Sequence, residues 1–255
     1  MSFGYCHLSV IPLRETANDT SQMVSQLLFG DVFEIIEQVS AHWIKIKNAF
    51  DSYEGYIDAK QCIVVDEETY HQYQNSGIVN STVIAVNGNF GSIFLPPACQ
   101  VQENSYQVGN WKFEAIENIK KEDCSIRNEV VKVAKSYLNA PYLWGGKTPF
   151  GIDCSGFTQS VYKIAGIPLW RDASQQAKQG EVLSFIEEAQ PGDLAFFDNE
   201  EGNIIHVGIF ISNNEMIHAS GRVRIDKIDH VGIFNEETGS YSHKLRLIKE
   251  YISQG

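Results

Sequence analysis

The sequence has few basic residues for its length. Its 255 residues include 20 Lys and Arg against 32 Asp and Glu, which gives a formal net charge of −12 at pH 7. Affinity for nucleic-acid backbones comes largely from clustered Lys and Arg, so this balance argues against a nucleic-acid-binding protein. Hydrophobic residues make up 43% and charged residues 20%, the composition of a globular chain. A chain of this length is expected to form one large domain or two smaller ones.

Long apolar runs and a secretory leader are also missing. Residues 1–7 contain no basic stretch followed by an apolar run, which is the pattern of a signal peptide. The longest apolar runs, such as residues 207–211, are far too short to span a bilayer. We therefore expect a cytoplasmic protein that does not bind membranes.

Cysteine is scarce and shows no pairing pattern. The five cysteines are odd in number and form no C-x-x-C pair, so free thiols are expected in a reducing compartment rather than a disulfide framework. No group of His, Cys and Asp residues has the spacing of metal ligands, and we expect neither a metal nor another cofactor.

The first part of the sequence has the pattern of short strands. From about residue 10 to residue 65 the apolar runs are brief and closely spaced and have no helical period, which predicts a small β-barrel. Residues 66–123 fit either a connector or a second, degenerate unit of the same kind. Residues 1–65 resemble a bacterial SH3-like domain, and the resemblance rests on Leu13-Arg14, Leu28-Phe29-Gly30, Trp43 and Gly55-Tyr56-Ile57.

Residues 124–255 have a different pattern. Apolar residues at helical spacing from Val130 to Leu138 predict an amphipathic helix that ends before Pro141. A second helix is expected to begin at Cys154 and to end near Gly166. Helices followed by antiparallel strands predict an α+β domain. The strand-like segments that follow the helices are residues 194–197, 205–211, 216–220 and 245–248.

The Asp153-Cys154 pair places a cysteine at a predicted helix start. Asp153 is a good N-cap, so Cys154 takes the first helical position, where unpaired N–H groups and the helix dipole favour a thiolate. Such an environment lowers the pKa of a thiol from its usual value of ~8.5, most strongly beside a protonated imidazole. The alternative is an inert buried cysteine, as we expect for Cys62 and Cys99. A histidine partner distinguishes the two interpretations.

His206 is the leading candidate for that partner and for a general base. In its strand the apolar residues share one face, so His206 lies on the other face together with Gly208. His218 follows a turn signal at 212–215 and would orient His206 through the second ring nitrogen. A two-residue hairpin loop puts the two histidines on opposite faces, so the triad predicts an odd loop or a bulge. The remaining histidines are expected to be structural or solvent-facing: His7, His42, His71, His230 and His243.

The last half of the chain resembles the NlpC-type cysteine peptidases, papain-like enzymes that cut bacterial cell-wall peptides. The resemblance implies a papain-like catalytic domain, with helices and an antiparallel sheet, preceded by the small SH3-like β-barrel. It also implies Cys154 as nucleophile, His206 as base, His218 as the orienting third residue and Tyr142 as a contributor to the oxyanion site. The motifs that carry it occur in the family's order: Tyr142-Leu143-Trp144-Gly145-Gly146, Asp153-Cys154-Ser155-Gly156-Phe157, Pro191-Gly192-Asp193-Leu194, His206-Val207-Gly208-Ile209 and Ile217-His218-Ala219-Ser220.

The N-terminal barrel narrows the resemblance to the γ-D-glutamyl-L-diamino acid endopeptidases. These enzymes release L-Ala-γ-D-Glu from murein stem peptides with a free N-terminus, and the resemblance implies such peptides as the partners of this chain. It implies that Asp153 binds the substrate amine and that the barrel blocks longer substrates, with Tyr53 as a contributor. Relatives often carry Glu where this chain has Gln22. Further substrate-binding positions implied by the resemblance are Trp144, Ser155 and Ser174.

Two other functions stay open at this point. An amidase or acyltransferase on the same fold would act on a different linkage and would not need a free L-Ala amine. A non-catalytic module that binds wall fragments would not need the complete set of Cys154, His206 and His218. The sequence does not fix the diamino acid that follows D-Glu, nor the oligomeric state.

Overall fold

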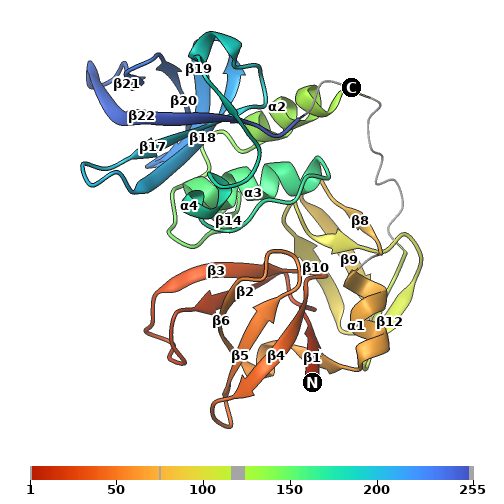
Figure 1. Ribbon diagram of the computed structural model, residues 1–255. Helices are drawn as coiled ribbons and strands as arrows, with labels where there is room; N and C mark the ends of the chain where they lie inside the picture. Colours follow the sequence, from red (N-terminus) through yellow and green to blue (C-terminus); the bar gives the residue numbers. More distant parts are fainter. Residues whose placement is uncertain (1, 75, 116–123, 253–255) are drawn as a thin grey trace. The chain divides into compact units, whose positions relative to one another are not determined.

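The structure is a computed structural model that describes residues 2–74, 76–115 and 124–252. The chain divides into two compact units, Met1–Glu122 and Asp123–Gly255, which are described one at a time (Figure 1). Both units are rich in sheet and contain few helices. No helix within the described ranges is long and apolar enough to cross a membrane.

The first unit contains a seven-stranded antiparallel sheet. One apolar core on this sheet is formed by Cys6, Phe33 and buried aliphatic side chains from neighbouring strands, and a second, largely aromatic cluster includes Tyr5. At the turn between the third and fourth strands, the Asp31 carboxylate accepts a hydrogen bond from the Leu28 N–H at 2.8 Å. In spatial order the strands are β3 (Met23–Leu28), β2 (Val10–Arg14), β6 (Glu54–Asp58), β5 (Trp43–Asn48), β4 (Val32–Gln38), β1 (Ser2–Tyr5) and β7 (Ile63–Val65).

The segment after the seven-stranded sheet packs against that sheet within the same unit. Helix α1 (Glu67–Gln74) places Tyr70 on Phe3 of β1, with ring centroids 4.4 Å apart. The Gln100 N–H donates to the Phe29 carbonyl at 2.9 Å. The remaining elements here are η1 (Ala59–Gln61), the sheet of β10 (Gly91–Leu95), β9 (Ile84–Gly88), β13 (Trp111–Phe113) and β12 (Tyr106–Val108), and the ladder of β11 (Gln100–Val101) and β8 (Ile78–Val79).

The second unit is built on an antiparallel sheet that closes on itself. Strand β21 pairs with β22, so six of the seven strands form a ring and β16 extends it at one edge. The α+β, papain-like description of this half remains a prediction; the closure of the strands into a barrel was not foreseen from the sequence. The spatial order is β16 (Glu181–Leu183), β22 (Ser240–Glu250), β17 (Leu194–Asp198), β18 (Ile204–Ser212), β19 (Glu215–Ser220), β20 (Arg222–Ile228) and β21 (Gly232–Asn235).

The helices of the second unit pack against this barrel. Helix α3 (Cys154–Ile164) is buried along its whole length, including its polar positions. Its buried polar side chains form hydrogen bonds with neighbouring elements. For example, Thr158 Oγ1 donates to Gln176 Oε1 of α4 (Ala173–Gln176) at 2.7 Å. Helix α2 (Ile126–Ser136) is tied down through Arg127, which bonds Asp193 at 2.8 Å. The short remaining elements are β14 (Lys147–Thr148), β15 (Gly151–Ile152) and η2 (Ile186–Glu188).

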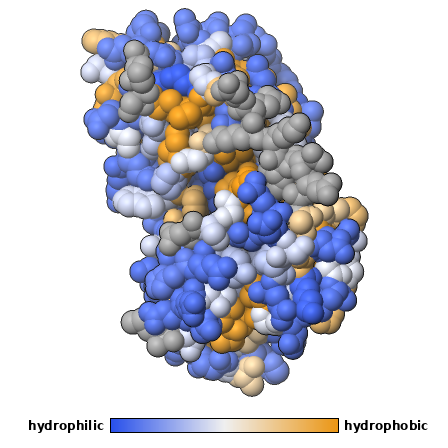
Figure 2. All heavy atoms as spheres, turned by 90° about the vertical axis from the view of Figure 1, so that its right-hand side faces the viewer, coloured by the Kyte–Doolittle hydropathy of each residue, from blue (hydrophilic) through white to orange (hydrophobic). Residues whose placement is uncertain are grey.

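The predicted secondary structure of the second unit is largely confirmed. The first helix begins at Ile126 and ends at Ser136, before Pro141, and the second begins at Cys154 as expected. All four predicted strand segments lie within strands. The face of the molecule shown in Figure 2 is mainly hydrophilic, with hydrophobic residues in smaller patches, as expected for a chain of ordinary globular composition.

The contact between the seven-stranded sheet and the following segment gives a stability prediction at Gly30. Its φ is +88°, and a Cβ added there would lie 1.9 Å from the Gln100 carbonyl oxygen. Gly30→Ala should therefore lower the free energy of unfolding through both backbone strain, about 1–3 kcal/mol, and this clash. Gly91→Ala is the matched control, because Gly91 has a φ of +105° but open space around its Cβ position. Equal losses in urea denaturation would contradict the predicted clash.

Candidate active site

The candidate site is built around the start of α3. Asp153 is the N-cap, with an extended backbone, and its Oδ1 accepts a hydrogen bond from the Gly156 N–H at 2.6 Å. Cys154 is therefore the first residue of the helix and is buried. This confirms the predicted position of the cysteine at the end of the helix where the unpaired N–H groups lie.

A buried arginine faces the capping carboxylate. Arg171, with 1% of its surface exposed, bonds Asp153 through both terminal nitrogens, Nη2 to Oδ2 at 2.5 Å and Nη1 to Oδ1 at 3.1 Å. The Gly145 N–H donates to the same Oδ2 at 2.8 Å, and Arg171 Nη1 also donates to Ser155 Oγ at 2.9 Å. The Asp153 carboxylate thus has a cationic partner and fixes the loop before α3. Arg171 was not predicted, although it lies only three residues before Ser174, which was.

The pKa of the Cys154 thiol differs from the sequence-based expectation. Burial, followed by the negative charge of Asp153, raises it to about 12, against the lowering influence of backbone hydrogen bonds from Val207 and Ser155 and the charge of Arg171. The prediction of a thiolate is therefore wrong for the site without substrate. Desolvation of Cys154 raises the pKa of the thiol more than the start of the helix lowers it. The thiol is protonated at neutral pH.

His206 lies on a central strand, directly before the residue whose backbone contacts that thiol. It belongs to β18, which pairs with β17 on one side and β19 on the other, so it is not an edge-strand residue. The next residue, Val207, makes the backbone hydrogen bond to Cys154. Burial, together with the nearby His218 and His243, holds the pKa of His206 well below its usual value. His206 is therefore neutral at pH 7.

The two predicted histidines are brought together by a bulge. The hairpin pairs Ser212 with Glu215 at its tip, but the register shifts after Phe210 so that Gly208 lies opposite His218. His218 is then diagonal to His206 on the same face, and His206 Nε2 lies 2.8 Å from His218 Nδ1. The prediction of an odd loop or a bulge is confirmed. The space beside Gly208 is filled, since an added Cβ would lie 2.9 Å from His218 Cβ.

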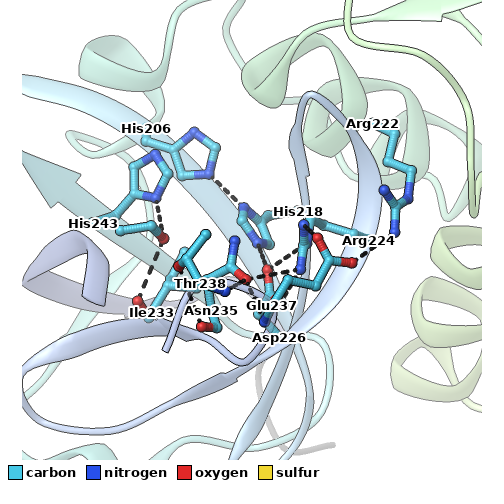
Figure 3. Close-up of polar contacts among 11 residues, drawn as sticks. His206, His218, Arg222, Arg224, Asp226, Ile233, Asn235, Glu237, Thr238 and His243 are labelled. Carbon is cyan, nitrogen blue, oxygen red and sulfur yellow. Dashed lines mark hydrogen bonds and ion pairs between the residues drawn. The ribbon is translucent and has the colours of Figure 1, made fainter. Parts of the chain in front are cut away.

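His218 also contacts an acidic residue that was not predicted. His218 Nε2 lies 2.9 Å from Oδ2 of Asp226, which stands on the next strand, β20. Figure 3 shows His206, His218 and Asp226 as one connected row, with Arg224 beside the carboxylate. No motif marked Asp226, because its place depends on the register between β19 and β20.

His243 also belongs to the site, against expectation. Its ring stacks on that of His206, with centroids 4.1 Å apart and an interplanar angle of 21°, and Figure 3 shows the two side by side. Burial, followed by the neighbouring His218, lowers the pKa of His243 to about 4, so it is neutral at pH 7. The sequence around His243 resembles no motif; strand β22 brings it here through the pairings of the barrel.

The other predicted positions have varied surroundings. Tyr142 and Trp144 are exposed, and the pKa of Tyr142 is raised to about 12 by desolvation, followed by the influence of Cys154 and Asp153. Ser174 is exposed on α4. In the first unit, Tyr53 packs against the apolar core that contains Phe33, and Gln22 is exposed. Their substrate-binding roles remain predictions.

Fold and motifs together define the class of protein. Residues 139–242 match the NlpC/P60 family, and residues 13–61 match the bacterial dipeptidyl-peptidase Sh3 domain. The chain therefore combines an NlpC/P60 domain with a preceding bacterial SH3-like domain, as both resemblances in the sequence predicted. Cys154, His206, His218 and Asp226 all lie within the NlpC/P60 range, and His243 lies directly after it.

Three proteins that are named as dipeptidyl-peptidases are similar to this chain. The chain is 26% identical over 240 residues to Dipeptidyl-peptidase 6 of Lysinibacillus sphaericus, covering 82% of this chain and 85% of that one. It is 41% identical over 93 residues to the gamma-D-glutamyl-L-lysine dipeptidyl-peptidase of Bacillus subtilis, covering 36% of this chain and 31% of that protein. The corresponding Bacillus cereus protein is 36% identical, with 44% and 35% covered. The chain thus matches about a third of the length of these last two relatives.

A solved structure shares the whole fold. The crystal structure of an NlpC/P60 family protein from Bacillus cereus superimposes with a TM-score of 0.78 and covers 98% of this chain and all of its own. The two sequences are 19% identical over that match, so the likeness establishes the fold alone.

The ion pair at the helix start gives a second stability prediction. Arg171→Met leaves the Asp153 carboxylate buried without its cation, which should cost about 3–5 kcal/mol in the free energy of unfolding. Arg246→Met is the control, because Arg246 is exposed and lies 3.6 Å from Asp198, and it should cost less than about 1 kcal/mol. Denaturant unfolding measures both. A small loss for Arg171→Met would contradict the compensating role assigned to this arginine.

The low pKa of His243 predicts acid sensitivity. Its pKa falls from the usual 6.5 to about 4 in the folded chain, so the unfolded chain binds the extra proton and stability is lost as pH falls from about 6.5 to 4. The stacked ring contributes about 2–3 kcal/mol to this loss. His243→Phe keeps a ring on His206 but cannot titrate, so its unfolding free energy should fall less steeply over that range. An unchanged slope would contradict the prediction.

Proposed function

We propose that this protein is a cysteine peptidase that cleaves cell-wall stem peptides at the γ-D-glutamyl-L-diamino acid bond. The observation that carries the proposal is the hydrogen bond between His206 and His218, together with the contact that Val207, the residue after His206, makes to the Cys154 thiol through its backbone. The relatives named dipeptidyl-peptidases support peptide hydrolysis, and two of them carry gamma-D-glutamyl-L-lysine in their names.

The proposed chemistry begins from a neutral pair. The thiol of Cys154 has a raised pKa and His206 a lowered one, so neither is charged before substrate binds. As Cys154 Sγ attacks the γ-D-glutamyl carbonyl carbon, its proton passes to His206 and the carbonyl oxygen becomes an oxyanion. The proposed donors to that oxyanion are the Cys154 N–H, at the start of α3, and the Tyr142 hydroxyl.

The second half of the cycle reverses these transfers. His206 gives its proton to the departing amine of the diamino acid, which leaves an acyl-enzyme on Cys154. Water then attacks the thioester while His206 accepts its proton, and release of the dipeptide restores the thiol. Throughout, His218 holds His206 in one orientation by their 2.8 Å contact.

The proposal includes recognition of a free N-terminal L-Ala. Asp153 is the proposed partner of its ammonium group, and Trp144, Ser155 and Ser174 are proposed pocket positions. The Asp153 carboxylate already accepts hydrogen bonds from Arg171, Gly145 and Gly156. An ammonium group would therefore share the carboxylate with Arg171. The proposed setting is cytoplasmic recycling of released wall peptides, which cell fractionation tests.

Paired substrates test the proposal without disturbing Asp153. L-Ala-γ-D-Glu-diaminopimelate is offered with a free and with an N-acetylated terminus, and products are identified by mass spectrometry. Cleavage of the free peptide alone is the expected result. Cleavage of both would contradict amine recognition and indicate a broader wall hydrolase. Cleavage of neither would favour an amidase, an acyltransferase or a module that only binds wall fragments.

The nucleophile is tested by substitution. Cys154→Ala should lower turnover by at least about 10⁴-fold, because it removes the attacking atom. Its unfolding free energy should change by only about 1 kcal/mol, since the substitution removes a single sulfur atom. Cys124→Ser, at an exposed cysteine, is the control and should retain full turnover. Activity retained by Cys154→Ala would contradict the assignment.

A further inference from the structure

Three polar side chains form a diagonal row across neighbouring strands of the second unit. Because Gly208 lies opposite His218, His206 is diagonal to His218 across β18 and β19. Because His218 lies opposite Arg224, Asp226 is diagonal to His218 in the same way across β19 and β20. All three members of the row, His206, His218 and Asp226, are at most 6% exposed (Figure 3).

The carboxylate at the end of this row is held in its ionised form. Arg224 donates from Nη2 to Asp226 Oδ1 at 2.8 Å, and its Nε lies 2.7 Å from Oδ2. Burial alone would raise the pKa of Asp226, but the hydrogen bonds from His218 and Arg224 outweigh it and hold that pKa below its usual value. An ionised carboxylate accepts hydrogen bonds and cannot donate them.

That fact determines where the protons of the row lie. His218 Nε2, 2.9 Å from Asp226 Oδ2, must carry a proton, so in the neutral ring Nδ1 is the acceptor. His206 Nε2, 2.8 Å from that Nδ1, must then donate. In the neutral His206 ring, only Nδ1 is left with a free lone pair.

We infer that Asp226 is a positioning residue that sets the tautomers of both histidines and so makes His206 Nδ1 the atom that takes the thiol proton. The inference rests on the proposed function, since it assigns the atom that acts as base. Asp226 acts through His218 and touches no reacting atom. The sequence holds no motif for it, because the residue reaches His218 only through the pairing of β19 with β20.

A merely structural role for Asp226 would have different consequences. In that case its carboxylate would serve only to neutralise Arg224, and its loss would affect activity through stability, whether or not His218 is present. A double-mutant cycle with His218 separates the two roles, because a residue that acts through His218 has no further effect once His218 is removed.

The cycle is measured in the full chain on the free stem peptide. Asp226→Asn should lower kcat roughly 10- to 100-fold, the range seen when a partner that orients a histidine is lost, with KM little changed. In a His218→Ala background the same substitution should cause no further loss. Equal losses in both backgrounds, or no loss in either, would overturn the inference.

A matched control removes the same charge nearby. Glu236 pairs with Lys227, the residue after Asp226, and both side chains of that pair are exposed. Glu236→Gln should leave kcat unchanged. A loss equal to that of Asp226→Asn would mean that the general loss of negative charge, and not the contact with His218, explains the effect.

The tautomers themselves are measured by ¹⁵N NMR of the histidine rings, which requires neither turnover nor a variant that folds. In the unmodified protein at neutral pH, Nε2 should be protonated and Nδ1 unprotonated in both His206 and His218. The opposite tautomer in either ring would overturn the inference. If no peptide is cleaved but these tautomers are found, the proposed substrate fails while the positioning by Asp226 stands.

Discussion

The buried carboxylate of Asp153 organises the surroundings of the candidate nucleophile. An isolated charge in such a place would be very costly, and it is tolerated because Arg171 and backbone N–H groups surround it. One oxygen caps α3, and the other holds the Gly145 loop. The Asp153 carboxylate therefore joins the helix start that carries Cys154, the loop that carries Gly145 and the segment that carries Arg171. None of these three segments has another covalent or metal anchor in the part of the chain that the structure describes.

The barrel of the second unit supplies the other half of the site by register. Neighbouring strands each contribute one member of the His206, His218 and Asp226 row, and β22 brings His243 onto the first of them. A bulge near the hairpin tip is what moves His218 to the correct face. Strand pairing thus positions the proposed base, just as the Asp153 cap positions the thiol. The strand of the proposed base contacts the thiol through Val207, the residue after His206, whose backbone forms a hydrogen bond with Cys154.

Local features of this site were predictable from the sequence, and long-range ones were not. The Asp153 cap depends on residues within three positions, and the bulge followed from requiring His206 and His218 on one face. Asp226 and His243 depend on strand pairings between segments far apart or in unknown register, so no local pattern marked them. The thiol pKa was mispredicted because the sequence reveals a helix start but not how deeply it is buried.

The protonated resting state of Cys154 has a consequence for chemical durability. Peroxides and electrophiles attack the thiolate far faster than the thiol, and a thiol with a raised pKa presents almost none of that form at neutral pH. A cysteine kept in this form between substrate encounters is expected to be oxidised to sulfenic and higher acids more slowly than a thiolate. The burial that delays ionisation of the sulfur therefore also slows its oxidation.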